Sequence, residues 1–250
     1  PAGTRVSLEV ARHGFVDLAH AIQVASRVRW DPSGVLVLGG FPTDDTNAAL
    51  LHLAHALGTP VPDTRMPGHA MEGNLVYRVE FNPQNQDEHA YSATAGNFPL
   101  HTDGAHWKQP PHLVLLLCCR ASSSGGDTTL AHVEDVLAQV EAGHIQQLVN
   151  VPVGFDDVDA PVLQREPWRI RWNHATLQRR HQRGLWRPHR ATLDACHALD
   201  VALAGLAARH ALRLAPGELL VVDNTRVLHG RTPFVATSNR LLKRVRVRQG

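Results

Sequence analysis

The sequence has no apolar stretch long enough to cross a membrane. Its longest uninterrupted apolar run, Leu113 to Cys119, is far shorter than the roughly 20 residues that a membrane-spanning helix needs. Residues 1–20 carry charges where a signal peptide would be continuously apolar. We therefore expect a soluble, cytoplasmic protein that has no membrane partner.

Cysteine is also scarce, with three residues in the chain. Cys118 and Cys119 are adjacent and would not readily pair with each other, which leaves Cys196 as the one candidate partner for either. This distribution favours a reducing compartment and agrees with a cytoplasmic location.

Aromatic residues make up 5% of the chain, and the net charge is only +2. One dense basic stretch, RLLKRVRVRQG at residues 240–250, could suggest nucleic-acid binding. No aromatic RNA-binding platform or helix-turn-helix pattern accompanies this stretch. We expect a small-molecule substrate rather than a nucleic acid, and the sequence allows a homo-oligomer.

The composition, with 43% hydrophobic and 19% charged residues, is that of an ordinary globular protein. No repeat or linker divides the chain, so residues 1–250 are expected to form a single domain. Near the N-terminus the pattern predicts a helix over about 16–28, a buried strand over 34–40, and a helix ending at Leu57 with Thr43, Asp44 and Asp45 as possible N-caps.

The character of the chain changes at about residue 73, where short apolar runs alternate with turn residues. These runs, at 75–81, 112–120, 219–225 and 240–248, predict a β-sandwich or barrel. Helices are predicted at 133–142 and 190–210, packed against the sheets. The segment 151–187 has few signals and is either a mobile loop over a site or a surface excursion.

The sharpest chemical feature is His101-Thr-Asp103. In a β-strand, residues two apart project from the same face, so the imidazole and the carboxylate can converge on one metal. Alone, such a pair is more often a surface hydrogen bond than a metal site. His229, directly after the apolar run 219–225, is the candidate third ligand. Two histidines and one carboxylate leave three open positions on Fe(II), which a bidentate oxoacid and O₂ can fill.

Together with the segments around them, these residues resemble the taurine dioxygenase superfamily of Fe(II)/2-oxoglutarate oxygenases, which includes γ-butyrobetaine hydroxylase and clavaminate synthase-like enzymes. The resemblance covers 34–41, the helix ending at Leu57-Gly58, 98–103, the GGDTT turn at 125–129, 223–234 and 240–244. It implies a mainly β fold with flanking helices, a double-stranded β-helix (cupin-like jelly roll). In this fold two sheets hold the metal between them, and helices lie outside one sheet.

The resemblance also implies a co-substrate site. Thr128, in the GGDT turn, and Arg240, eleven residues after His229, match the residues that bind the distal carboxylate of 2-oxoglutarate. A guanidinium can hold a carboxylate bidentately, and a hydroxyl can donate a further bond. Strand alternation places Arg244 on the same face as Arg240, so we assign it to the co-substrate as well. The alternative is that these arginines solvate an edge strand.

On the substrate side, Asn97 matches a position that contacts substrate in the taurine enzyme, although a turn asparagine explains it equally well. We add Trp107 and the segment 151–187 to this side. Asn224 and Arg231 belong to the family motif around His229, and they either orient the metal ligands or serve a structural role.

The resemblance predicts an enzyme that hydroxylates or desaturates an unactivated C–H bond of a small molecule, releasing succinate and CO₂. Amino-acid-derived or secondary metabolites are the expected substrates. Retention of Asp103 argues against halogenation, and it also argues against the arginine oxygenase branch, which has glutamate at this position. The alternatives are a non-catalytic metal-binding jelly-roll sensor and a cupin-type metal-dependent isomerase.

Overall fold

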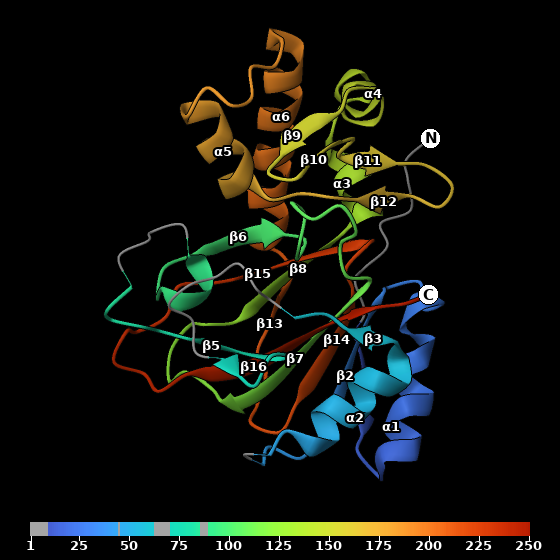
Figure 1. The fold of residues 1–250 in the computed structure, drawn as a ribbon, viewed down its shortest axis with the longest axis vertical. Helices are drawn as coiled ribbons and strands as arrows, with labels where there is room; N and C mark the ends of the chain where they lie inside the picture. Colours follow the sequence, from blue (N-terminus) through green and yellow to red (C-terminus); the bar gives the residue numbers. More distant parts are fainter. Residues whose placement is uncertain (1–9, 45, 63–70, 86–89) are drawn as a thin grey trace.

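Two β-sheets face each other at the centre of the protein (Figure 1). The structure is a computed structural model that describes residues 10–44, 46–62, 71–85 and 90–250. The large sheet has the order β1-β2-β14-β7-β16-β5-β4 with β3 beside β16, and the small sheet has the order β13-β8-β15-β6. The strands are β1 (Ala11–Gly14), β2 (Val35–Gly39), β3 (Thr59–Pro60), β4 (Met71–Glu72), β5 (Val76–Glu80), β6 (Phe98–His101), β7 (Leu113–Arg120), β8 (Thr128–His132), β13 (Ala211–Leu212), β14 (Leu219–Asp223), β15 (Val227–Arg231) and β16 (Leu241–Arg248).

Helices and two short hairpins surround the sheets. The helices are α1 (Leu18–Ala25), α2 (Ala48–Leu57), α3 (Val133–Gln139), α4 (Ala142–Asn150), α5 (His174–Gln182) and α6 (Arg190–Ala207), with single 3₁₀ turns at η1 (Ser26–Arg29) and η2 (Tyr91–Ala93). The hairpins pair β9 (Val153–Phe155) with β10 (Val158–Ala160) and β11 (Leu163–Gln164) with β12 (Arg169–Ile170).

Apolar side chains fill three layers. Val35, Val114, Val222 and Leu242 pack between the two sheets together with Leu130 of the small sheet. A second cluster joins α1 and α2 to the outer face of the large sheet, and a third joins α3, α4 and α6 to the outer face of the small sheet. We expected helices outside one sheet; in the structure they cover both (Figure 1).

The mainly β fold with flanking helices is confirmed, and so are the strands at the four apolar runs, as β5, β7, β14 and β16. The predicted helix over 133–142 is in fact α3 followed by a second helix, α4. The segment 151–187 is not a structureless loop, because it contains both hairpins and α5. The residue before α2 is Asn47 in the left-handed conformation rather than a Thr43 or Asp44 cap, and Asp45 lies outside the described residues.

Strand β16 is an inner strand rather than an edge, because it pairs with β7 on one side and with β5 on the other. Its basic side chains are accordingly buried: Lys243, Arg244 and Arg246 are all at most 7% exposed. Lys243 faces α2, where Nζ donates to Asn47 Oδ1 at 2.7 Å. These three side chains of the C-terminal basic stretch therefore point into the protein rather than onto its surface.

The three cysteines are free thiols, as their spacing indicated. Within the described part of the chain, no helix is both long and apolar enough to span a bilayer.

The pairing of β6 with β15 sets the geometry of the candidate site. His101 lies directly opposite His229 in this antiparallel pair, and β15 pairs with β8 on its other edge. Gly230 lies in the middle of this three-strand arrangement. A Cβ there would lie 2.5 Å from the carbonyl oxygen of Phe98 and 2.7 Å from Thr129 Oγ1, so only glycine allows the strands to approach this closely.

We predict that Gly230→Ala destabilises the protein by about 1–3 kcal/mol, because the methyl group forces β6 away from β15. Gly205→Ala is the matched control: its Cβ meets nothing within 4 Å, and alanine in helix α6 should stabilise the fold by roughly 0.5–1 kcal/mol. Urea unfolding monitored by circular dichroism measures both. Equal stability of Gly230→Ala and the wild type would contradict the packing argument.

Candidate metal centre

Three side chains converge between the sheets. His101 is the last residue of β6 and His229 lies in β15, so the β6–β15 pairing brings the two imidazoles together, with ring centroids 4.6 Å apart. We predicted that Asp103 lies on the same strand as His101. It lies instead in the turn just after β6, so the turn, rather than strand alternation, aims its carboxylate at the histidines.

Ligand atoms of these three residues lie within 4.8 Å of one another, and all three residues are buried. Asp103 Oδ1 is 3.4 Å from His101 Nε2 and 3.6 Å from His229 Nε2. The spacing matches three donors arranged around one ion, and this is the one cluster of three or more such residues found among the described residues.

The protonation of His101 suits metal binding. Its Nδ1 lies 2.9 Å from the carbonyl oxygen of Pro99 and donates to it, which leaves Nε2 with its lone pair toward the site. Burial, together with the neighbouring His229, lowers the pKa of His101 to about 4, so the ring is neutral at pH 7. Nε2 of both histidines is buried without a hydrogen-bond partner among the described residues, as expected for nitrogens that can bind a cation.

Asp103 is held in its ionised form by two arginines. Burial by itself raises the pKa of this carboxyl, but the Arg244 and Arg246 guanidiniums lower it well below its usual range. Arg246 Nε donates to Oδ2 at 2.7 Å, and Arg244 Nη1 donates to Oδ1 at 3.2 Å. Oδ2 is thus bound by Arg246, whereas Oδ1 faces both imidazoles. This arrangement favours a carboxylate that binds a metal through one oxygen.

The turn that carries Asp103 is fixed by Asn224. Its Oδ1 accepts from the backbone N–H of Asp103 at 2.8 Å, and its Nδ2 donates to the carbonyl oxygens of Asp103 and Pro111. Arg231 acts elsewhere: it donates to the carbonyl oxygens of Tyr91, Thr94 and Gly96, in the segment that leads into β6. Asn224 therefore fixes the backbone of the candidate ligand Asp103, and Arg231 supports the segment before β6.

Thr128 and Arg240, predicted as co-substrate residues, line one small cavity of about 10 Å³ together with Gly126 and Leu242. Arg240 Nε donates to the carbonyl oxygen of Gly126 at 3.2 Å, and its Nη1 is buried without a partner among the described residues. Burial lowers the pKa of Arg240 to about 10, and no carboxylate hydrogen-bonds to it.

The two predicted substrate residues lie in different places. Trp107 is half-buried and stacks under the guanidinium of Arg246 at 5.4 Å, which connects it through that residue to Asp103. Asn97 is exposed and lines a groove between β6 and α6, a groove that none of the three candidate ligands lines. The structure therefore brings Trp107, but not Asn97, to the neighbourhood of the metal centre.

The family model for the taurine catabolism dioxygenase TauD, TfdA family matches residues 16–246. The chain belongs to this family. The chain is therefore an iron- and 2-oxoglutarate-dependent dioxygenase. The cluster of His101, Asp103 and His229 provides the donor set that Fe(II) requires. Family membership favours an oxygenase over the alternatives of a non-catalytic sensor or a cupin-type isomerase.

Solved structures agree with this assignment. An asparagine oxygenase in complex with Fe(II), 2S,3S-3-hydroxyasparagine and succinate is similar to the chain, with a TM-score of 0.73 and 25% identity over 92% of this chain and 79% of that chain. Another asparagine oxygenase structure has 26% identity over the same shares, also with a TM-score of 0.73. The non-heme iron oxygenase OrfP, in complex with Fe and α-ketoglutaric acid, has a TM-score of 0.69 and 20% identity over 92% of this chain and 80% of that chain, and shares the fold. No curated protein matches the chain.

Arg246 is the residue that sequence reasoning missed. It lies two positions beyond Arg244, so the same strand alternation that grouped Arg240 with Arg244 also places Arg246 on that face. The signal was present in the strand pattern, but a partner for the side chain became visible only in the tertiary structure.

We predict that Arg246→Leu weakens binding of Fe(II), or of Co(II) as its coloured substitute, by roughly 10- to 100-fold, because Asp103 loses the donor that fixes its outer oxygen. Anaerobic Co(II) titration followed by absorption measures this affinity. Arg248→Leu, on the same strand with its guanidinium on the Gln109 carbonyl oxygen, is the matched control.

Arg246→Lys keeps a charge near Asp103 and should recover part of the affinity. Circular dichroism verifies that each variant is folded. Equal Co(II) affinities of Arg246→Leu and Arg248→Leu would show that Arg246 does not position the ligand.

Proposed function

We propose that this dioxygenase hydroxylates, or desaturates, an unactivated C–H bond of a small amino-acid-derived molecule. His101, Asp103 and His229 hold the iron, and Thr128, Arg240 and Arg244 bind 2-oxoglutarate. When bound, Fe(II) and 2-oxoglutarate supply O₂ activation, with release of succinate and CO₂. The observation that carries the proposal is the pair of histidine nitrogens with no hydrogen-bond partner among the described residues, facing one oxygen of a buried, ionised carboxylate.

The co-substrate assignment is supported by Arg240. Among the described residues this buried guanidinium donates to a single carbonyl oxygen, so it retains most of its donors and its full charge. The distal carboxylate of a dicarboxylic acid offers the matching charge and geometry, and the Thr128 hydroxyl lines the same cavity. The cavity itself is small, so the carboxylate would have to displace the Arg240 side chain from Gly126.

Arg244 is the second arginine that supports the co-substrate assignment. It lies over the ring of Tyr77 at 4.6 Å and donates to Asp103 from the face of β16 that also carries Leu242 of the inter-sheet core. A second guanidinium at the metal centre suits the charge of the oxoacid end of the co-substrate.

The substrate class is supported by the surroundings of Trp107. This residue lines an open cavity of about 660 Å³ together with Lys108, Asp157 and Arg248. Charged side chains of both signs are what an amino acid, with its ammonium and carboxylate groups, requires. The similarity to asparagine oxygenase points to the same class. Asn97 is retained as a predicted substrate contact, although its groove beside α6 gives it no support.

We predict that Arg240→Ala weakens 2-oxoglutarate binding by roughly tenfold or more, because the charged hydrogen bonds to the distal carboxylate are lost. Adding 2-oxoglutarate to the anaerobic Fe(II) protein should produce a metal-to-ligand charge-transfer band whose titration gives the affinity. Arg120→Ala, which removes an exposed arginine from β7, is the control. Equal affinities in the two variants would reassign Arg240 to a structural role.

We also predict that at least one amino acid in a panel of the twenty standard residues and their simple derivatives stimulates succinate release at least tenfold over the uncoupled rate. Mass spectrometry of the product should show a gain of one oxygen or a loss of two hydrogens. Asp103→Ala should be folded and show no stimulation. If no member of the panel stimulates turnover in a protein that forms the charge-transfer band, the substrate class is wrong while the oxygenase assignment stands.

A further inference from the structure

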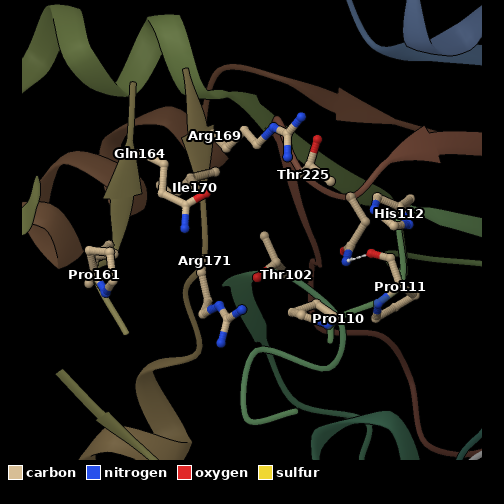
Figure 2. Close-up of a pocket in the computed structure, with 12 residues that line it drawn as sticks. Thr102, Pro110, Pro111, His112, Pro161, Gln164, Arg169, Ile170, Arg171 and Thr225 are labelled. Carbon is tan, nitrogen blue, oxygen red and sulfur yellow. Dashed lines mark hydrogen bonds between the residues drawn. The ribbon is translucent and has the colours of Figure 1, made fainter. Parts of the chain in front are cut away.

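A cavity of about 120 Å³ lies beside the metal-binding turn and is lined by none of the three candidate ligands. Its volume is well above the roughly 10–15 Å³ that one buried water needs. Three segments that are distant in the sequence form its walls: the stretch from Thr102 to His112, the β11–β12 hairpin with its flanks, and the turn after β14. Figure 2 shows Gln164, Arg169 and Arg171 on one side of this space, with Thr102, Pro111 and His112 on the other.

The lining is cationic. Arg169 and Arg171 both contribute to the wall, and none of the twelve lining residues is acidic. The Arg169 side chain makes no hydrogen bond or ion pair with any described residue. Arg171 Nη1 donates to the carbonyl oxygen of Trp107 at 3.2 Å, and burial lowers the pKa of this guanidinium without any carboxylate to compensate.

Neutral donors complete the wall. Gln164 contributes an amide. The Nδ1 of His112 accepts from the backbone N–H of Gln249 at 3.0 Å, so Nε2 carries the ring proton and is a donor. The carboxylate of Asp223 accepts from the lining residue Thr225 and is paired with Arg226 at 2.7 Å. Burial lowers the pKa of His112, and the charges of Arg29 and Arg169 lower it further, which reports a positive local potential.

We propose that this cavity is a second ligand site, distinct from the iron and co-substrate site, and that it binds a small oxoanion, either a carboxylate or a phosphate group. Two guanidiniums, an amide and an imidazole N–H are donors of the kind that such an anion requires. The site stands on its own donors and does not depend on the identity of the oxidised substrate.

We expect a ligand in this cavity to change the metal affinity, because one wall of the cavity is formed by the turn that carries Asp103. Thr102, between the ligands His101 and Asp103, lines the cavity, and its backbone N–H donates to the carbonyl oxygen of Trp172 at 2.8 Å. Asn224, which also lines it, fixes the backbone of Asp103 on both sides. An anion held against these two residues changes the position of Asp103 and therefore the affinity for the metal.

The first test is isothermal titration calorimetry of the metal-free protein with inorganic phosphate and, separately, with succinate. We expect Arg169→Ala to weaken binding of the preferred probe by roughly tenfold or more. Gln164→Ala should weaken it less, because Gln164 is exposed and uncharged whereas Arg169 is half-buried and charged. Arg165→Ala is the matched control, because Arg165 follows β11 in the same hairpin, lies over Trp168 and does not line the cavity.

The two probes distinguish a phosphate site from a carboxylate site. Binding of either probe that depends on Arg169 and not on Arg165 supports the proposal. The absence of measurable binding of both probes, or equal affinities in Arg169→Ala and Arg165→Ala, overturns it. Succinate binding that is lost in Arg240→Ala but kept in Arg169→Ala assigns the anion to the co-substrate site and also overturns the proposal.

The second test measures Co(II) affinity with and without a saturating concentration of the bound probe. Linkage requires the probe to change Co(II) affinity by the same factor by which Co(II) changes the affinity for the probe. We expect a change of at least threefold in the wild type and none in Arg169→Ala. Anion binding that leaves Co(II) affinity unchanged would overturn the coupling to Asp103.

Discussion

The burial of one carboxylate connects the two sheets of this protein. Asp103 leaves the small sheet at the end of β6, while its two guanidinium partners, Arg244 and Arg246, belong to β16 in the centre of the large sheet. An ionised carboxylate away from water is costly unless opposite charges and hydrogen bonds compensate it. The position of the third metal ligand therefore depends on a strand from the opposite sheet as much as on its own turn.

The same constraint explains the density of buried cations along β16. Arginines are rarely buried without partners. Arg244 and Arg246 both donate to the Asp103 carboxylate, whereas the buried Arg240 donates to the carbonyl oxygen of Gly126. Nη1 of Arg240 has no hydrogen-bond partner among the described residues, so this guanidinium has a free donor for a carboxylate of the proposed co-substrate.

The metal-binding turn has two sides with different environments. On one side, His101 and Asp103 face His229; on the other, Thr102 faces a cavity with two arginines. The Asn224 side chain hydrogen-bonds to the backbone of Asp103 and also lines that cavity, so it contacts both environments. A short turn with this arrangement can transmit the occupancy of one side to the geometry of the other, because Thr102 lies directly between His101 and Asp103 in the chain.

The sequence determined the chemistry. The order and spacing of His101, Asp103, Thr128, His229 and Arg240 identified the family, and the alternating apolar runs identified the strands, because both signals are local. The sequence predicted the helix boundaries less accurately than the strands. Helix α4 and the hairpins of the segment 151–187 had no strong local pattern, since their formation depends on packing against α6 and the small sheet.

Only the tertiary structure decided what each basic residue of β16 does. In the sequence, RLLKRVRVR is compatible with a solvated edge strand, a nucleic-acid surface or a buried site. Its pairing with β7 and β5 makes it an inner strand, which turns Lys243 toward α2 and Arg246 toward Asp103. Likewise, the residues that line the cavity containing Arg169 are far apart in the chain. No local sequence pattern predicts that cavity, because only the tertiary fold brings those segments together.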